Sequence, residues 1–235
     1  MVSSTGEARD VYRPPSTRQR LNELFVAREP ARLLGSFPQL VRTARGDNRA
    51  MMLAPGFSAN DISLLPLKRF LKSRGHNTFG WGLGTNRGDV QGMIEPVKKR
   101  VRQLAESSGR PVNLVGWSLG GVFVREVARD LPEIVERVAT FGTPLFGPRA
   151  TAASSAFGDV AIEEIERMID ERSLIPITVP VLAVHTRRDG VVDWRSCIDD
   201  HTPGVRNVEL TSSHIGLGLD PELWKLLADW FAAGR

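Results

Sequence analysis

Short apolar runs alternate with longer amphipathic stretches along most of the chain, starting at residue 50. Continuous apolar runs of this length predict buried strands, and apolar residues spaced by three and four predict helices. The predicted strands are 50–55, 76–83, 111–117, 135–142, 179–186 and 206–211. The predicted helices between and after them are 61–75, 91–109, 119–130 and 220–234.

Strands that alternate with helices predict βαβ units, and therefore a mostly parallel sheet covered on both faces. Within 61–75, Pro66 is expected to break or shift the helix. Pro96 is expected in the first turn of 91–109, where proline is tolerated. Asp220 and Pro221 are a plausible N-cap and first helical residue for the last helix.

Two segments lie outside this alternation. Residues 1–15 are polar and predicted to be disordered. The rest of the extension, to residue 49, has apolar spacing that predicts two short amphipathic helices, the second interrupted by Gly35 and Pro38, packed on the main domain of residues 50–235. Residues 143–178 separate two predicted strands and contain one amphipathic helix, so we expect a small cap or lid there.

Composition narrows the class of protein. The 235 residues suit one α/β domain, and 41% hydrophobic and 25% charged residues are ordinary for a globular protein. The net charge of +4 is concentrated in the first fifty residues, which hold nine arginines and five acids. No nucleic-acid motif accompanies them, which leaves a solvated surface or weak contact with an anionic membrane surface.

The expected cellular location rests on sequence features of membrane and secreted proteins. No apolar run approaches the roughly 20 residues of a membrane span, and the first residues lack the apolar core of a secretory signal. The single Cys197 allows no disulfide within the chain and is expected to be a buried small residue. We therefore expect a cytoplasmic protein.

Candidate chemistry centres on the stretch Gly-Trp-Ser-Leu-Gly at 116–120. Ser118 lies between a predicted strand and a predicted helix, where a nucleophile elbow would place it. Gly116 and Gly120 would remove side chains that collide with neighbouring elements. The hydroxyl would then stand near the helix N-terminus, where developing negative charge is favoured. An ordinary turn is the alternative.

A serine hydroxyl needs a base, and the base needs an acid. Among the four histidines, His214 follows the last predicted strand, at the sheet edge where α/β sites gather; the others are His76, His185 and His201. Asp189 follows the preceding strand, with Gly190 allowing a turn. Its rivals are Asp193, Asp199 and Asp200, each of which could be a turn or helix cap.

The backbone N–H of Leu119 would supply one donor of an oxyanion hole. Phe57, after the turn at Pro55-Gly56, would supply the second. Pro144 and Leu145 are candidate substrate-lining residues, although both could be plain core.

The order Ser118, Asp189, His214 with this preceding loop resembles the α/β-hydrolase superfamily, and is most similar to its small bacterial lipases and esterases. The resemblance covers roughly residues 50–233 and includes the Gly-Thr-Pro segment at 142–144. It implies a three-layer α/β-hydrolase fold. Many relatives have His-Gly where this chain has Pro55-Gly56, and the strands that usually open the fold are not evident in 1–49, so a shortened sheet is expected.

The residues favour acyl transfer through an acyl-enzyme on an apolar small-molecule or lipid ester. A thioesterase or acyltransferase would use the same three residues, and a non-catalytic binding protein is the alternative from another class. A serine at the elbow disfavours dehalogenases, which place an aspartate there. No cluster of His, Cys and Asp has metal-ligand spacing, so neither a metal nor a cofactor is expected.

Overall fold

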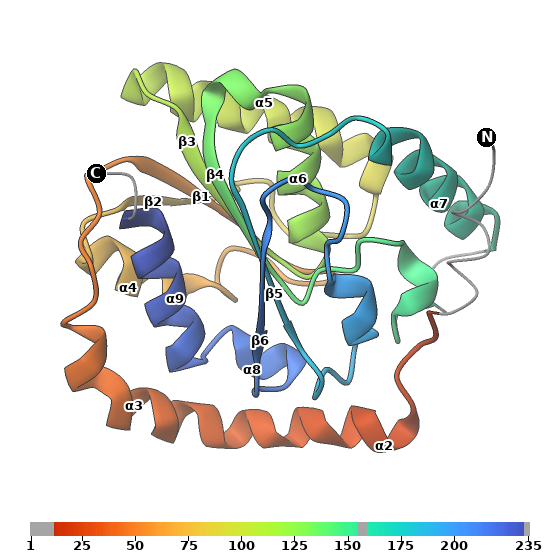
Figure 1. The fold of residues 1–235 in the computed structure, drawn as a ribbon, viewed down its shortest axis with the longest axis horizontal. Coiled ribbons are helices and arrows are strands. Elements are labelled where there is room, and N and C mark those ends of the chain that lie inside the picture. Colours follow the sequence, from red (N-terminus) through yellow and green to blue (C-terminus); the bar gives the residue numbers. More distant parts are fainter. Residues whose placement is uncertain (1–11, 155–158, 233–235) are drawn as a thin grey trace.

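The computed structural model describes residues 12–154 and 159–232. Within these residues six strands form one sheet in which every neighbouring pair is parallel, in the order β2-β1-β3-β4-β5-β6 (Figure 1). All six correspond to predicted strands, and no strand is found among the described residues before residue 50. The strands are β1 (Ala50–Ala54), β2 (Asn77–Gly80), β3 (Val112–Trp117), β4 (Val135–Phe141), β5 (Val181–Thr186) and β6 (Arg206–Leu210).

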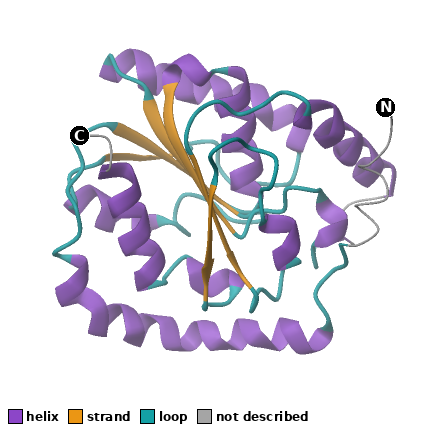
Figure 2. Cartoon of the chain, viewed as in Figure 1, coloured by secondary structure: helices purple, strands orange, loops and turns teal. Residues whose placement is uncertain are grey.

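Helices cover both faces of the sheet and make three layers (Figure 2). Because side chains alternate along a strand, Met51 and Leu53 of β1 face one hydrophobic cluster, and Met52 and Ala54 face another. The first cluster includes side chains of α4 (Leu65–Ser73) and α9 (Pro221–Ala232), and the second those of α5 (Val90–Ser108) and α6 (Leu119–Asp130). Crossovers of this kind bring the carboxyl ends of all strands to one edge.

Residues 17–40 of the N-terminal extension form one continuous helical rod, and the predicted interruption at Gly35 and Pro38 is wrong. The N-terminal rod (residues 17–40) consists of α2 (Thr17–Arg20), the 3₁₀ helix η1 (Leu21–Arg28) and α3 (Glu29–Leu40), and it crosses the lower edge of the molecule in Figure 1. Gly35 and Pro38 lie inside α3; Pro38 falls in its last turn, where only one intrahelical bond is lost. The predicted disorder of 1–15 lies mostly outside the described residues, and residues 12–15 have no regular structure.

Pro66 shifts the start of its helix, as expected, whereas Pro96 does not lie in the turn predicted for it. Helix α4 begins at Leu65, with Pro66 in its first turn, because Asp61 instead accepts hydrogen bonds from the N–H groups of Trp81 and Gly82. Helix α5 begins at Val90, so Pro96 lies in its second turn rather than its first.

The remaining elements are short, apart from one helix in the 143–178 insertion. They are η2 (Pro132–Ile134), η3 (Pro148–Ala150), α7 (Asp159–Ser173), η5 (Trp194–Cys197) and α8 (His214–Leu217).

None of the helices in the described residues has both the length and the apolar character needed to cross a bilayer.

Candidate active site

Ser118 occupies a strained turn between β3 and α6. Its backbone has φ 52° and ψ −127°, a region that side chains other than glycine rarely adopt. Such a conformation costs about 1–3 kcal/mol and persists at functional sites because the surroundings impose it. Although Ser118 is at the N-cap position of α6, its hydroxyl makes no capping hydrogen bond. The ordinary turn or cap role is therefore not what its side chain performs.

Glycines around Ser118 are required by close backbone approach. A Cβ at Gly116 would lie 2.4 Å from the Cα of Gly121, and one at Gly120 would lie 2.2 Å from the carbonyl oxygen of Ala54. Gly121 is as constrained, because a Cβ there would be 2.0 Å from Thr143 Oγ1. The sequence pattern singled out the first and last positions of 116–120 but gave no signal for the role of Gly121.

Asp189 and His214, 25 residues apart in the chain, meet in the interior. His214 Nδ1 lies 2.7 Å from Asp189 Oδ2, and both side chains are almost fully buried. The other carboxylate oxygen of Asp189 accepts hydrogen bonds from the N–H groups of Val191 and Val192, at 2.8 and 2.6 Å. With both of its oxygens hydrogen-bonded, the carboxylate is held rigidly against one edge of the imidazole.

Gly142 makes room for this pair. It follows β4 with φ 58°, and a Cβ there would lie 2.8 Å from His214 Nδ1 and 3.5 Å from Asp189 Oδ2. The glycine of the Gly-Thr-Pro segment is thus required by its closeness to the imidazole, a role that the sequence analysis did not assign to it.

The rival acids have other partners. Asp193 caps η5 through the N–H of Arg195, at 3.1 Å, and Asp199 pairs with the buried Arg125. Asp200 is exposed.

The other histidines lie elsewhere. His185 stacks on Trp194, His76 is buried against Phe231, and His201 is exposed beside Phe146. The structure therefore brings together the acid and the base that the sequence favoured.

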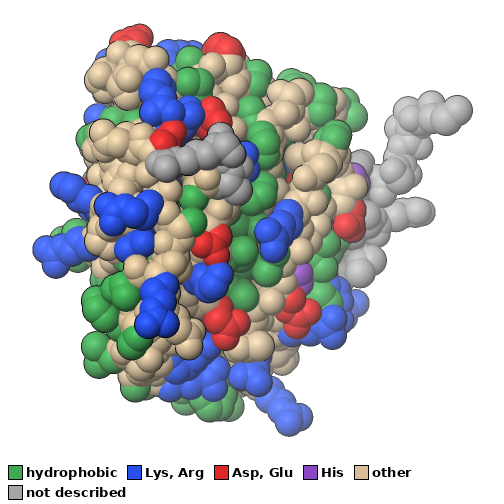
Figure 3. Space-filling view, turned by 60° about the vertical axis from the view of Figure 1, so that its left-hand side comes forward, with side chains coloured by type: hydrophobic (Ala, Val, Ile, Leu, Met, Phe, Trp, Pro, Cys, Tyr) green, Lys and Arg blue, Asp and Glu red, His purple; other side chains and the backbone are tan. Residues whose placement is uncertain are grey.

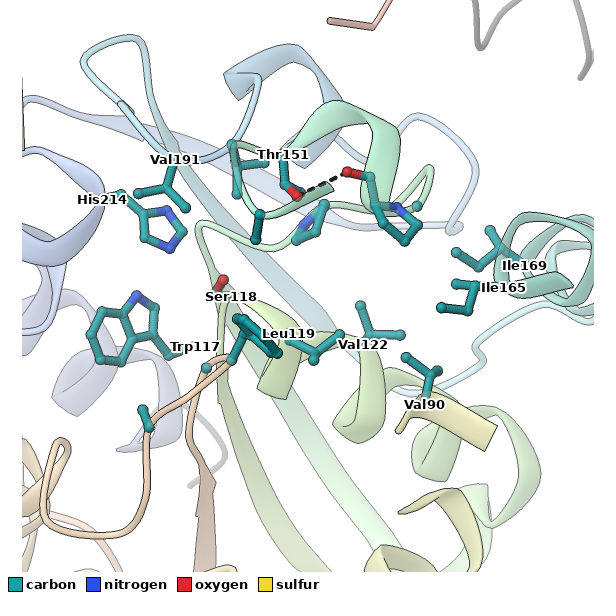
Figure 4. A pocket seen from close by; sticks show the side chains of 18 of the residues that line it. Val90, Trp117, Ser118, Leu119, Val122, Thr151, Ile165, Ile169, Val191 and His214 are labelled. Atoms are coloured by element: carbon teal, nitrogen blue, oxygen red, sulfur yellow. Dashed lines mark hydrogen bonds between the residues drawn. The ribbon is translucent and has the colours of Figure 1, made fainter. Parts of the chain in front are cut away.

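A cavity of about 330 Å³ opens beside Ser118 and His214, which both contribute to its wall (Figure 4). In Figure 4 the Ser118 hydroxyl lies on the cavity side of the elbow, with the His214 ring above it. The rest of the wall is mainly apolar and includes Trp117, Leu119, Val122, Pro144, Ile165, Ile169, Val191, Val192 and Ile215.

The two predicted substrate-lining residues, Pro144 and Leu145, differ in the cavities that they line. Pro144 lines both this cavity and a second one of about 550 Å³, whereas Leu145 lines only the second. Ile165 and Ile169 of α7 close the first cavity on the side of the 143–178 insertion. That insertion is tied to the loop of the acid by a bridge between Thr151 and Val192.

The two predicted oxyanion donors lie on the wall of the cavity. Leu119 is the first residue of α6, so its N–H has no acceptor within the helix. Phe57 lies in the loop after β1, and this loop passes so near the elbow that a Cβ at Gly56 would be 3.1 Å from Ser118 Cβ.

Asn86 holds the loop of Phe57 in place, and sequence reasoning missed it. Its buried side chain donates to the carbonyl of Pro55 at 2.9 Å. Its backbone exchanges hydrogen bonds with Ser58 and Ala59, at 2.7 and 2.8 Å. Asn86 lies in a loop whose Gly and Asn residues are typical of a turn, and nothing in the sequence indicates that Pro55 is its partner.

Opposing effects set the pKa of His214. Burial lowers it, but the charge of Asp189, the hydrogen bond between them and the charge of Glu23 outweigh burial, so the pKa is raised above its ordinary value of 6.5. Among the described residues, no three His, Cys, Asp or Glu side chains are grouped so that they could hold a metal ion.

Comparison with known proteins identifies the fold. No protein-family model matches the chain, and no curated protein matches its sequence. Among solved structures, the carboxylesterase CesB (YbfK) from Bacillus subtilis is similar at a TM-score of 0.56, with 15% identity over 88% of this chain and 99% of that one. The chain has the α/β-hydrolase fold.

Two further solved structures are similar to the chain. A Paleococcus ferrophilus monoacylglycerol lipase is similar at a TM-score of 0.61, with 14% identity over 82% of this chain and 97% of that one. Mouse alpha/beta hydrolase domain-containing protein 10 reaches 0.53, with 22% identity over 80% and 89%. At these identities the likeness concerns the fold, so the case for chemistry must come from the site.

If His214 acts as a general base, it must be neutral in the free protein. Because its pKa is raised above 6.5, kcat/KM should fall with decreasing pH along a limb centred above 6.5. The measurement is kcat/KM for p-nitrophenyl butyrate between about pH 5 and about pH 9, with circular dichroism at each pH as the control for unfolding. A limb centred below 6.5 in folded protein would contradict this assignment.

Proposed function

We propose that this α/β-hydrolase-fold protein is a serine carboxylic-ester hydrolase of the lipase or esterase type. One observation carries the proposal: Ser118, in its strained conformation, lines the same apolar cavity as His214. The Nδ1 atom of His214 is held by the buried Asp189. This arrangement supports the assignment of Ser118 as nucleophile, His214 as base and Asp189 as orienting acid.

The acylation step follows from these roles. Ser118 Oγ attacks the ester carbonyl while His214 Nε2 takes its proton, and Asp189 stabilises the resulting imidazolium. The carbonyl oxygen becomes an oxyanion beside the N–H groups of Leu119 and Phe57. When the tetrahedral intermediate collapses, the imidazolium gives the proton to the leaving alkoxide, and the acyl group remains on the serine.

Deacylation uses the same groups with water as the nucleophile. His214 removes a proton from water, the acyl carbonyl is attacked, and the carboxylic acid leaves as Ser118 regains its proton. One oxyanion donor contributes roughly a hundred- to thousand-fold in rate. The rigidity that Asn86 confers on the loop of Phe57 supports this part of the proposal, because such donors work by being fixed in advance.

The wall of the cavity supports apolar acyl groups as substrates. Ile165, Ile169, Val122 and Pro144 offer carbon surface and no charge, which favours a hydrocarbon chain over a polar acyl group. Thioesterase and acyltransferase activities would use the same groups, so comparing thioester with oxyester turnover and adding an alcohol acceptor separates these enzymes.

The substitution Ser118→Ala should lower turnover of p-nitrophenyl esters at least about a thousand-fold, since it removes the nucleophile. The same substitution should abolish labelling by a fluorophosphonate probe. Ser107→Ala, on the exposed face of α5, is the matched control and should change neither readout. A Ser118→Ala variant with wild-type turnover, or a wild-type protein that the probe never labels, would refute the proposal, the latter favouring a non-catalytic binding protein.

Acyl-chain preference should reflect the apolar wall. From p-nitrophenyl acetate to the butyrate, kcat/KM should rise by about four-fold per added methylene, the value expected for burial of one such group. Ile165→Trp should fill part of the cavity and abolish this rise while leaving acetate turnover nearly unchanged. A wild-type series that peaks at acetate would disprove the preference.

We also propose that the outer face of the N-terminal rod rests on an anionic lipid surface. Leu24, Leu34 and Phe37 are 72%, 77% and 62% exposed, which is unusual for side chains of this size. Figure 3 shows hydrophobic side chains interspersed with Lys and Arg along the lower edge of the molecule, where Figure 1 places α2 and α3. Ile215, half-exposed at the cavity, donates its N–H to Glu23 of the rod, so the rod lies beside the cavity.

Vesicles test this contact directly. The protein should co-sediment with vesicles containing phosphatidylglycerol and much less with phosphatidylcholine alone, because the arginines are attracted to anionic lipid. Leu24→Glu combined with Phe25→Glu should abolish binding, whereas Ile62→Glu, an exposed apolar position outside the rod, should not. If the double variant instead splits a dimer in gel filtration, with no vesicle binding by the wild type, the face meets a second copy.

A further inference from the structure

The side chain of Glu23, on η1, makes three hydrogen bonds to backbone N–H groups of the site. Its Oε1 accepts from Gly190 at 2.8 Å and from His214 at 3.0 Å, and its Oε2 accepts from Ile215 at 2.9 Å. Gly190 directly follows Asp189. One carboxylate from the N-terminal rod therefore joins the loop of the acid to the loop of the base.

The rod and the acid loop touch backbone to backbone at Gly190. A Cβ there would lie 2.7 Å from the carbonyl oxygen of Gln19, 2.9 Å from the Cα of Arg20 and 3.0 Å from Glu23 Cγ. Gly190 does not have a positive φ, so it is needed for close approach rather than for the turn expected from the sequence. Contact this close leaves the loop little freedom to shift relative to Glu23.

Ion pairs at a second place fix the rod beside the loop of His214. Glu29 is completely buried and pairs with Arg32 at 2.6 Å. Arg32 also donates to Ser212 Oγ at 3.1 Å and lies 3.5 Å from Asp220. Because Ser212 is two residues before His214, the rod is bonded to the chain both before and at the histidine, which makes Glu23 part of a rigid attachment.

We propose that Glu23 is a positioning residue that holds the base and acid loops in register and adds its negative charge to that of Asp189 beside the imidazole. The kinetic part of this inference rests on the proposed function. Glu23 does not contribute to the cavity wall, so it acts through His214 and Asp189 rather than by touching substrate. The N-terminal rod then completes the site instead of merely covering the domain.

The charges that act on the imidazole come from two elements. Asp189 after β5 and Glu23 on η1 both favour its protonated form, while Trp117 at the end of β3 and Gly142 after β4 bring no charge against it. The imidazolium forms in both chemical steps, so loss of the Glu23 charge should slow both. The same loss should lower the pKa of His214.

Glu23→Gln is the informative variant, because it keeps the shape but removes the charge and turns an NH₂ group toward one of the three N–H donors. We expect kcat for p-nitrophenyl butyrate to fall roughly ten- to hundred-fold, as small misplacements of catalytic groups do. KM should change less than about two-fold, since the cavity wall is untouched. Glu106→Gln, an exposed position on α5, is the matched control and should retain wild-type kcat.

A second readout does not depend on activity. NMR titration of the ¹⁵N-labelled imidazoles, with His214→Asn to assign the signal, should show a lower pKa for His214 in Glu23→Gln than in the wild type. Glu23→Asp keeps the charge with a shorter reach; it should preserve most of that pKa and recover part of kcat. If the glutamine variant does not fold, the pKa of His214 and the kcat of the aspartate variant still test whether Glu23 acts on His214.

The outcomes are distinguishable. A folded Glu23→Gln with wild-type kcat and wild-type His214 pKa would overturn the inference, even if its melting temperature fell, because that is the behaviour of a merely structural residue. If the wild type shows no ester turnover and no fluorophosphonate labelling, the proposed function fails. The titration still determines in that case whether Glu23 acts on His214.

Discussion

The hydrogen bond between Asp189 and His214 is the constraint around which this structure is arranged. A buried carboxylate and a buried imidazole are each costly alone, and they are tolerated here because each satisfies the other. Holding them at 2.7 Å requires two loops to meet, a glycine at position 142 to leave space, and backbone donors to fill the remaining carboxylate oxygen. The parallel sheet supplies the common edge at which β4, β5 and β6 deliver these parts.

The sheet alone does not complete the site. Ser118 and the loop of Phe57 come from β3 and β1, but the apolar wall opposite them comes from α7 in the 143–178 insertion, and the outer support comes from the N-terminal rod. Both segments lie outside the βαβ alternation. A short α/β-hydrolase fold, without strands among its described residues before 50, thus uses helical additions where they can shape the cavity and fasten its loops.

Much of this fold and site was visible in the sequence, and the misses have two different causes. The six strands and the Ser118, Asp189 and His214 positions follow from local signals: apolar runs, the glycine frame and the loops after strands. The close approach at Gly190 does not, because it depends on Gln19, Arg20 and Glu23, which are distant in the chain. The start of α5 and the continuity of α3 are instead local features that were misjudged: Asp89 caps α5 by accepting from the N–H of Gly92, and Pro38 falls in the last turn of α3.

What the sequence determined by itself is the alternation of strands and helices, and with it a parallel sheet whose strand ends gather polar residues at one edge. Hydrophobic periodicity and glycine placement are local properties, so the amino-acid sequence alone reveals them. The tertiary structure alone decided that Asn86 fixes the Pro55 loop, that Leu145 lines only the second cavity whereas Pro144 lines both, and that Glu23 bonds to the backbone of the loops that carry Asp189 and His214. Those contacts join residues up to 192 positions apart, and no spacing rule relates them.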